Sequence, residues 1–288
     1  IDGNGKPEVI SLVDTSPGVP GQEGLQIFEW DQDSLSFLSS PTYTWDMGLD
    51  SVWEAAQIHV EDIDNDLNEE IIVSIMDGPW TEFGIGGSSR LMIFELDTIV
   101  NDSAIFNIEY EDTVWTNWSG YNISVGDLDN DSNKEIYSVG YEFFHLIVHE
   151  AIGQNMYQYQ TDFFVASEQA QRANQGIIII DIDNDGLNEM FCATSGVNSL
   201  TGELINPGSI FAIESVQDVS NLSYANFNFI TSYDGGIRQI NYGDADNDGN
   251  PNIYIAGHYD ESIYDLEYGG GDPLMVSSYS EKVIFMDD

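Results

Sequence analysis

Basic residues are scarce in this chain: its 288 residues include six Lys and Arg against 51 Asp and Glu, a formal net charge of −45. A nucleic-acid-binding protein needs a basic surface to replace the counterions on the phosphates, so the composition excludes that class. Electrostatic attraction to an anionic lipid surface is excluded by the same argument. Such a charge is tolerated where cations are bound or where a salty medium screens it.

Cysteine and long apolar runs are also lacking. Cys192 is the single cysteine, so no disulfide can form within the chain, and its place in EMFCAT predicts a buried structural thiol. Apolar runs such as 177–180 have the length of a strand, far below the roughly 18 residues of a membrane-spanning helix. The chain opens on Ile1 without a visible signal peptide, which predicts a mature product or an excerpt of a longer polypeptide.

Motifs of catalysis are missing as well. The sequence contains no Gly-x-Ser-x-Gly elbow, Walker loop or dinucleotide-binding fingerprint. Its four histidines share no metal-ligand spacing, and acidic pairs carry no information about glycoside hydrolysis in a chain with 51 acidic residues. We therefore assign no catalytic residue and expect no hydrolase or lyase turnover from this chain.

The acidic residues are concentrated in a nine-residue motif that recurs. DIDNDGLNE (181–189) has an acidic residue at alternate positions. The motif returns at intervals of 54 to 65 residues as DIDNDLNEE (62–70), DLDNDSNKE (127–135) and DADNDGNPN (244–252), with a shortened copy, DGNGKPE, at 2–8. Self-similarity at a fixed period predicts a repeat architecture. We number the nine positions of each loop from its first Asp.

Short apolar runs flank every copy of the motif. One run precedes it (QIHV, NISV, IIII, QINY), a second follows directly (EVISLV, EIIVSI, EIYSVG, EMFCAT, NIYIAG), and a third comes later (LQIFEW, LMIFEL, HLIVHE, SIFAIE, SIYDLE). Most units add a fourth. These β-branched and aromatic runs indicate strands, and no window has a sustained helical period.

Four strands in about 60 residues predict an all-β chain that forms a β-propeller of four-stranded blades. We expect a single domain over 1–288, with repeat units beginning near 2, 62, 127, 181 and 244, and we favour five blades. The acidic loop would join the first and second strands of each blade.

The two ends of the chain continue the repeat. VIFMDD at the C-terminus followed by IDGNGKPE at the N-terminus puts Asp288 at position 1 and Asp2 at position 3. The run 282–286 therefore resembles the first strand of the first unit. Either it pairs beside 9–12 and closes a ring of five units, or the chain is one period of a longer tandem array.

The loop at 181–189 provides oxygen atoms at alternate positions. Asp181, Asp183 and Asp185 hold positions 1, 3 and 5, Leu187 offers a backbone carbonyl at position 7, and Glu189 holds position 9. A hard cation with six to eight oxygen ligands requires such a set. Gly at position 6 allows a sharp turn, and Asn at position 4 tolerates left-handed geometry. We assign Ca²⁺ over the more strongly hydrated Mg²⁺, and no Cys/His cluster is present for zinc. Strands in place of helices exclude an EF-hand.

Strands, period and ligand pattern together resemble the FG-GAP/VCBS repeat family, which includes the propeller of integrin α chains. The resemblance covers nearly the whole chain and implies calcium loops on one face of an extracellular propeller. The implied ligands are Asp62, Asp64, Asp66 and Glu70; Asp127, Asp129, Asp131 and Glu135; Asp181, Asp183, Asp185 and Glu189; Asp244, Asp246 and Asp248. In the same register, the predicted set is completed by Asn68, Asn133, Leu187 and Asn250 at position 7 and by Asp2, Asn4, Lys6, Glu8 and Asp288 in the first copy.

The sequence departs from this pattern at four positions. Leu67 and Ser132 replace the turn glycine, Asn252 replaces the acid at position 9, and Lys6 holds position 7 of the shortened copy.

The resemblance leaves the activity open. We expect an extracellular or cell-surface module for adhesion, structure or ligand binding, with a protein or glycan partner or with self-association. A carbohydrate-active enzyme, or the sugar-binding domain of one, is an alternative, as is the subunit of an extracellular filament or tandem array. Candidate ligand-binding residues on the face opposite the calcium loops are Trp53, Trp118, Arg172 and Arg238. Packing of the Trp rings between blades is the competing interpretation.

Overall fold

The computed structural model describes the backbone of residues 2–13, 24–46, 53–77, 89–100, 103–114, 122–139, 145–164, 174–196, 207–234, 236–244, 251–257, 263–268 and 276–282. Within these residues the chain is all-β, which confirms that expectation: strands β1 to β20 are accompanied by two short 3₁₀ helices, η1 (Val219–Asn221) and η2 (Tyr224–Asn226). No helix in these ranges is long and apolar enough to cross a membrane.

The chain divides into two compact units. Unit 1 comprises Ile1–Thr116 together with the short turn Gly153–Met156, and unit 2 comprises Asn117–Ile152 and Tyr157–Asp288. Because the positions of the two units relative to each other are not determined, each unit is described by itself.

Unit 1 contains one sheet with the strand order β1-β2-β4-β8-β7-β6-β5, and β3 pairs with β2 beside this path. Its strands are β1 (Glu8–Val13), β2 (Gly24–Asp31), β3 (Ser36–Phe37), β4 (Tyr43–Asp46), β5 (Trp53–Glu61), β6 (Glu70–Asp77), β7 (Ser89–Val100) and β8 (Ser103–Val114). The first two repeat units therefore share a sheet, where separate blades were expected. They are joined by one parallel pair, Thr44 with Ser103, at the outer strands β4 and β8.

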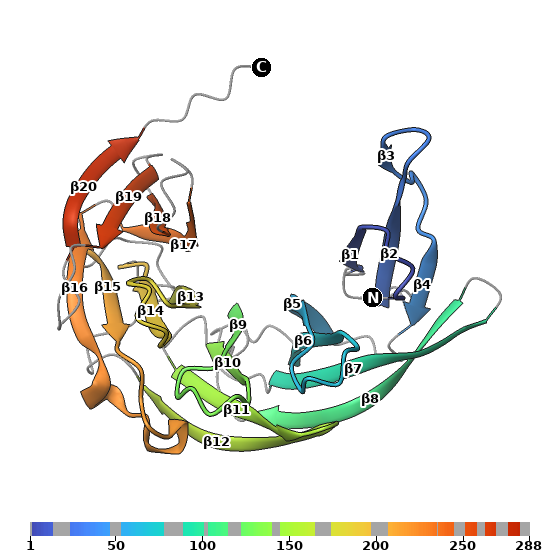
Figure 1. The fold of residues 1–288 in the computed structure, drawn as a ribbon, viewed down its shortest axis with the longest axis horizontal. Helices are drawn as coiled ribbons and strands as arrows, with labels where there is room; N and C mark the ends of the chain where they lie inside the picture. The colour runs from blue at the N-terminus through green and yellow to red at the C-terminus, as the bar shows by residue number, and fades with distance from the viewer. Residues whose placement is uncertain are drawn as a thin grey trace. The chain divides into compact units, whose positions relative to one another are not determined.

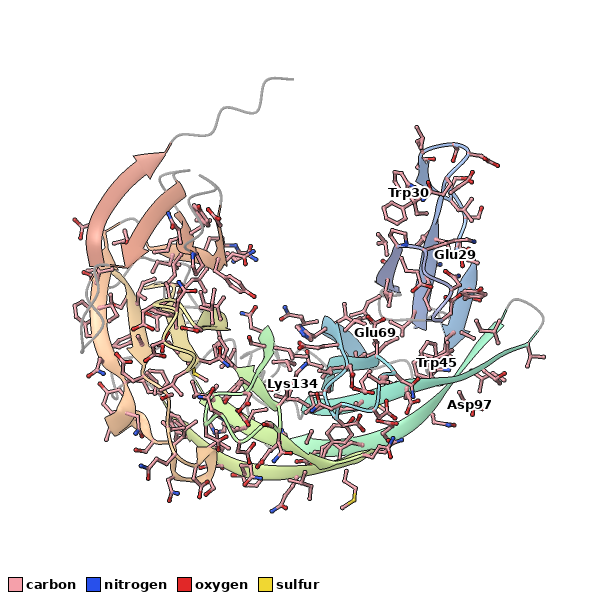
Figure 2. The ribbon with its side chains drawn as sticks, in the orientation of Figure 1. Glu29, Trp30, Trp45, Glu69, Asp97 and Lys134 are labelled. Atoms are coloured by element: carbon pink, nitrogen blue, oxygen red, sulfur yellow. The ribbon has the colours of Figure 1, made fainter. Side chains whose placement is uncertain are left out.

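The core of unit 1 lies between these strands. Its buried residues include Leu25, Ile27, Ile71, Val73, Met92, Phe94, Ala104 and Phe106. Trp45 on β4, labelled in Figure 2, packs edge-on against Phe94, with ring centroids 4.6 Å apart, and in a tilted arrangement against Phe106 at 4.9 Å. Leu25 and Ile27 on β2, and Met92 and Phe94 on β7, are each two residues apart, so one face of each strand lies in this core.

Unit 2 contains three four-stranded antiparallel sheets, ordered β12-β11-β10-β9, β13-β14-β15-β16 and β17-β18-β19-β20. The strands are β9 (Asn122–Gly126), β10 (Glu135–Val139), β11 (His145–Gly153), β12 (Met156–Phe164), β13 (Asn174–Ile180), β14 (Glu189–Thr194), β15 (Gly208–Ile213), β16 (Asn228–Tyr233), β17 (Ile237–Gly243), β18 (Asn252–Gly257), β19 (Ile263–Tyr268) and β20 (Val276–Lys282). Each sheet corresponds to one repeat unit, as the sequence predicts.

The sheets of unit 2 pack face to face. One buried cluster, with Leu128, Tyr137, Met190 and the buried Cys192, lies between the first and second sheets, and another, with Ile178, Phe191 and Ile255, lies between the second and third. The first strands β9, β13 and β17 lie side by side, with the fourth strands at the far edges (Figure 1). Glycine allows the close approach, because a Cβ on Gly126 would lie 2.7 Å from Ile179 Cγ2.

The C-terminal strand of the described chain belongs to the last sheet. β20 ends at Lys282, which pairs with Ile263 on β19. Lys282 was expected to begin the first strand of the first unit, but it is the last residue of a fourth strand. The remainder of that predicted strand, 283–286, and Asp288 lie outside the described residues. The predicted closure of a ring by this strand therefore stays a prediction.

Candidate cation-binding loops

Three complete acidic loops are described, each connecting the first and second strands of a repeat unit. The loops 62–70, 127–135 and 181–189 join β5 to β6, β9 to β10 and β13 to β14, respectively. Their backbones share left-handed residues at positions 4 and 6: Asn65 (φ 63°) and Leu67 (79°), Asn130 (58°) and Ser132 (77°), Asn184 (59°) and Gly186 (90°). The shortened copy has the same geometry at Gly3 (70°) and Gly5 (78°). The repeat in sequence is thus a repeat in conformation.

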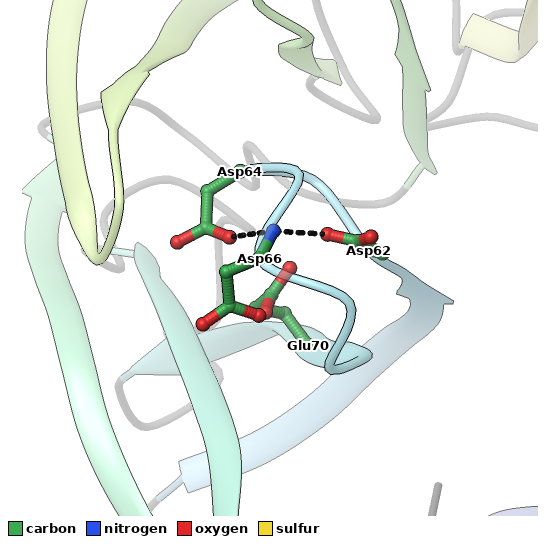
Figure 3. Close-up of side chains that lie close together, drawn as sticks. All are labelled: Asp62, Asp64, Asp66 and Glu70. Atoms are coloured by element: carbon green, nitrogen blue, oxygen red, sulfur yellow. Dashed lines mark hydrogen bonds between the residues drawn. The ribbon is translucent and has the colours of Figure 1, made fainter.

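Backbone N–H groups hold the aspartate side chains inside each loop. In the 62–70 loop, the N–H of Asp66 donates to Asp62 Oδ1 at 3.1 Å and to Asp64 Oδ1 at 3.2 Å (Figure 3). The N–H of Leu67 donates to Asp62 Oδ2 at 3.2 Å. The same three bonds recur in the 181–189 loop. Such turns, in which a carboxylate accepts from nearby backbone, fix the side chains that alternate along the loop.

Position 9 is tied to position 2 in all three loops. The N–H of Ile63 donates to Glu70 Oε2 at 2.6 Å, and the corresponding distances are 2.8 Å for Leu128 to Glu135 and 3.0 Å for Ile182 to Glu189. The apolar side chains at position 2 are buried and anchor the loop in the core. The glutamates are buried as well, with at most 2% of each residue exposed.

The carboxylates converge within each loop. Four of them, at positions 1, 3, 5 and 9, bring oxygens within 4.8 Å of one another in the 62–70 and 127–135 loops (Figure 3). In the 181–189 loop, Asp181, Asp183 and Glu189 do so. Glu70 Oε1, Glu135 Oε1 and Asp129 Oδ1 are buried and accept no hydrogen bond in the described part of the chain. A buried ionised oxygen without a partner is costly, and a bound cation would provide that partner.

Burial raises the pKa of the glutamates at position 9. Loss of hydration, together with the nearby Asp charges, raises the pKa of Glu70 and of Glu189 to about 7 and that of Glu135 to about 8. The N–H groups from position 2 act in the opposite direction. A divalent cation would favour the ionised carboxylates and reverse the unfavourable charge balance.

Segments outside the loop donate hydrogen bonds to the aspartate at position 3. Within unit 1, the N–H of Asn155 donates to Asp64 Oδ2 at 2.5 Å. Within unit 2, the N–H of Val219, the first residue of η1, donates to Asp129 Oδ2 at 3.1 Å. Burial raises the pKa of both aspartates. Position 3 thus receives a backbone donor from outside its own loop in both cases.

The shortened first copy has its own positive charge. Lys6 Nζ donates to Glu29 Oε2 at 2.9 Å, and Asn4 Nδ2 donates to Asp2 Oδ2 at 2.7 Å. Asp2, Glu8 and Glu29 bring oxygens within 4.8 Å of one another. The Lys6 ammonium therefore neutralises part of a cluster that resembles the cation loops. In the last copy, Asp244 is described, while Asp246, Asp248 and Asn250 lie outside the described residues.

In three repeat units a glutamate on the third strand lies opposite position 9 of the loop, and sequence reasoning missed it. Glu29, Glu95 and Glu150 lie directly across the sheet from the position-9 residues Glu8, Glu70 and Glu135, respectively. The signal was present in the third apolar runs, each of which ends in or near Glu (IFEW, IFEL, IVHE, AIE, DLE). Like charges directly opposite in a sheet are destabilising, so a repeated Glu pair calls for a compensating group.

A polar cavity of about 620 Å³ lies between the first two loops of unit 1. The carboxylates of Asp2, Glu8, Glu69 and Asp97 line it, with Lys6 as the basic residue in the lining. Its acidic lining suits a cation and disfavours an anionic ligand.

The predicted ligand-binding residues are described only in part. Trp53 is the first residue of β5, and Arg238 is the second residue of β17 and is exposed. Both lie at the beginning of a first strand, whereas the acidic loop follows its end, so they are at the opposite end of the strand from the loops. Trp118 and Arg172 lie outside the described residues.

Comparison with protein-family models finds no match to this chain, and a search of the curated proteins likewise finds no relative. The FG-GAP/VCBS resemblance stays a prediction that rests on the motif, its period and the loop geometry.

Proposed function

We propose that this chain is a calcium-binding repeat module of the FG-GAP/VCBS type, a β-propeller of four-stranded blades that acts in adhesion or ligand binding outside the cell or at its surface. The observation that carries the proposal is the pair of fully buried glutamates, Glu70 and Glu135. Each leaves its Oε1 without a hydrogen-bond donor among the described residues, within a ring of aspartates whose oxygens lie within 4.8 Å.

Calcium fits these sites better than the other common divalent ions. The donors are carboxylates and carbonyls, with no Cys or His in the described clusters, so zinc is disfavoured. Magnesium prefers to retain several waters, whereas up to four carboxylates converge here from one loop. Asp62, Asp64, Asp66 and Glu70 would hold one ion, and their counterparts in the next two loops would hold the others.

The propeller and its location are supported by packing and charge. In unit 2 three four-stranded sheets stack with their first strands adjacent, which is how blades pack in a propeller. The net charge of −45 suits an environment rich in salt and calcium. Extracellular modules use calcium sites with Kd values of about 10⁻⁴ to 10⁻³ M.

Calcium titration of the whole chain by isothermal calorimetry, with bound ions counted by native mass spectrometry, tests the proposal. Glu70→Gln and Glu135→Gln keep the side-chain shape but lose the charge, so each should remove one ion or weaken its site more than tenfold. Glu69→Gln is the matched control, since Glu69 is exposed in the same loop and outside the carboxylate ring. A wild-type chain that takes up no calcium at millimolar concentration would refute the metal function.

The partner is proposed to bind where the first strands begin, at the end of the strands opposite the loops. Exposed Arg238 would grip a carboxylate on a peptide or stack on a sugar. Screening the calcium-loaded protein against glycan and peptide arrays tests this placement. We expect Arg238→Ala to lose binding at an unchanged melting temperature, and retention of every ligand would locate the site elsewhere.

A further inference from the structure

The third-strand glutamates contact position 7 of the loops in three repeat units. Glu95 on β7 and Glu150 on β11 accept from Asn68 and Asn133, respectively, and Glu29 on β2 accepts from Lys6. The distances are 2.8, 3.4 and 2.9 Å. Glu29 and Glu150 are buried, with 6% and 9% of the residue exposed. The same contact thus recurs although the residue at position 7 changes.

In two loops the position-7 asparagine links this glutamate to the aspartate at position 5. Asn68 Nδ2 donates to Asp66 Oδ2 at 3.3 Å as well as to Glu95 Oε1, and the N–H of Asn68 donates to Asp66 Oδ1 at 2.8 Å. Asn133 makes the same bonds to Asp131, at 2.9 and 2.8 Å. Both oxygens of the position-5 carboxylate, and the backbone of position 7, are therefore held against the third strand.

The third loop lacks this connection. Its position 7 is Leu187, which has no side-chain donor, and the equivalent third-strand residue is Glu214. Only the backbone bond is kept, from the N–H of Leu187 to Asp185 Oδ1 at 2.8 Å. Asp185 is also the position-5 residue that the converging carboxylates of this loop do not include. The chain thus contains its own comparison between linked and unlinked loops.

We infer that Glu95 and Glu150 are positioning residues for the proposed cation sites. Acting through Asn68 and Asn133, they hold the position-5 aspartate and the position-7 backbone in the ligating arrangement before the ion arrives. The inference rests on the proposed calcium function. A loop that is already ordered loses less conformational entropy on binding, and outer hydrogen bonds to ligands typically change metal affinity about 10- to 100-fold. The 62–70 and 127–135 loops should therefore bind calcium more tightly than the 181–189 loop.

Exchanging the residue types found at position 7 of the different loops tests this inference on the whole chain. Asn68→Leu and Asn133→Leu keep every charge and install the residue of the third loop, so each should weaken one calcium site about tenfold without changing the number of ions bound. Leu187→Asn should tighten one site by a similar factor, because it places an amide beside Asp185 and Glu214. Calorimetry gives the affinities, and native mass spectrometry at stepped free calcium counts the ions.

Charge controls separate positioning from simple attraction. Glu95→Ala and Glu214→Ala remove the same charge and the same acceptor oxygens. Asn68 donates to Glu95, whereas Leu187 has no side-chain donor for Glu214. Positioning predicts a loss for Glu95→Ala well beyond that for Glu214→Ala. It also predicts that the double variant Asn68→Leu/Glu95→Ala is no weaker than the worse single variant. Asn68→Leu should lower the melting temperature more in calcium than in EDTA, because the lost hydrogen bonds weaken ion binding as well as the loop itself.

The possible failures are distinguishable. Equal losses for Glu95→Ala and Glu214→Ala, or unchanged affinity in Asn68→Leu and Leu187→Asn, would refute the positioning role while leaving calcium binding intact. If the wild-type chain binds no calcium, the proposed function fails, and this inference fails with it.

Discussion

Leu67 and Ser132 adopt a backbone conformation that favours glycine. Their φ angles are 79° and 77°, and the equivalent residue of the third loop is Gly186 at 90°. A side chain in the left-handed region costs about 1–2 kcal/mol, and Leu67, which is 90% exposed, gains no packing in return. The loop conformation is thus imposed by the carboxylate hydrogen bonds against the preference of the residue.

Leu67→Gly should therefore stabilise the protein. Relief of the left-handed strain exceeds the added flexibility of glycine in the unfolded chain, so we expect the free energy of unfolding to rise by about 0.5 kcal/mol. Gly186→Ala is the reverse experiment and should lower it by about 1 kcal/mol. Urea denaturation at fixed calcium measures both. A loss of stability in Leu67→Gly would mean that the Leu side chain contributes a contact.

The sequence predicts that the loop carboxylates converge but not that the third-strand glutamates lie beside them, for a physical reason. The carboxylates of one loop are close in sequence, so local hydrogen bonds place Asp62, Asp64 and Asp66 together. Glu95 reaches Asn68 only through the cross-strand register of β6 with β7, which depends on a connection of variable length. The register places Glu95 directly opposite Glu70, and nothing in the nine-residue motif specifies that pairing.

At the scale of strands and sheets, glycine decides how closely the first strands of unit 2 approach. Gly126 ends β9, and a Cβ there would lie 2.7 Å from Ile179 Cγ2 and 2.9 Å from Ile179 Cβ on β13. Gly243 ends β17 at the same place in its repeat, yet among the described residues the nearest atom to a Cβ there would be Tyr254 Cε2 at 4.0 Å. The two glycines are equivalent in sequence and different in packing.

Gly126→Ala should consequently cost about 1–3 kcal/mol of unfolding free energy, the usual range for overpacking. Gly243→Ala should change it by less than about 0.5 kcal/mol. Thermal and urea denaturation at constant calcium compare the pair. Equal effects of the two substitutions would show that β9 and β13 have room to separate.

The buried glutamates give the calcium-free loops a pH dependence. The pKa of Glu70, Glu135 and Glu189 in the folded protein is about 7 to 8, above the ordinary value of 4.5. The folded state therefore binds protons more tightly than the unfolded state, and this stabilisation is fully present below pH 4.5 and is lost as the pH rises through 7 to 8.

We accordingly expect the urea midpoint in EDTA to fall between pH 5 and pH 8. In saturating calcium the fall should disappear, because the ion favours the ionised glutamates. Glu135→Gln removes one titrating group and should flatten the EDTA profile. A midpoint that rises with pH in EDTA would contradict the assigned shifts.

Over the whole molecule, the all-β class and the four-stranded repeat follow from the sequence, because hydrophobic period and turn residues act locally. The shared sheet of unit 1 does not follow, since the pairing of Thr44 with Ser103 joins strands from different repeats. Sequence periodicity specifies which residues form a unit, whereas contacts between units depend on side-chain packing and on the geometry of the connections.

Because the chain has a net charge of −45, an effect of calcium on stability has two explanations. Calcium either screens the charge or binds to the acidic loops. Screening depends on ionic strength alone, with a Debye length of about 10 Å at 0.1 M salt, so sodium chloride provides it as well as calcium does. Site binding adds about 2.7 kcal/mol per site at a calcium concentration 100 times the Kd. With three complete described loops, binding would dominate over screening.

Melting at matched ionic strength should then separate the two. We expect calcium to raise the melting temperature by tens of degrees over EDTA, magnesium to raise it far less, and sodium chloride to have a small effect. Asp183→Ala should remove the contribution of the 181–189 loop and leave that of the 62–70 loop, because Asp62, Asp64, Asp66 and Glu70 form a separate carboxylate ring. If sodium chloride at equal ionic strength reproduces the calcium effect, the acidic loops are screened surfaces and not binding sites.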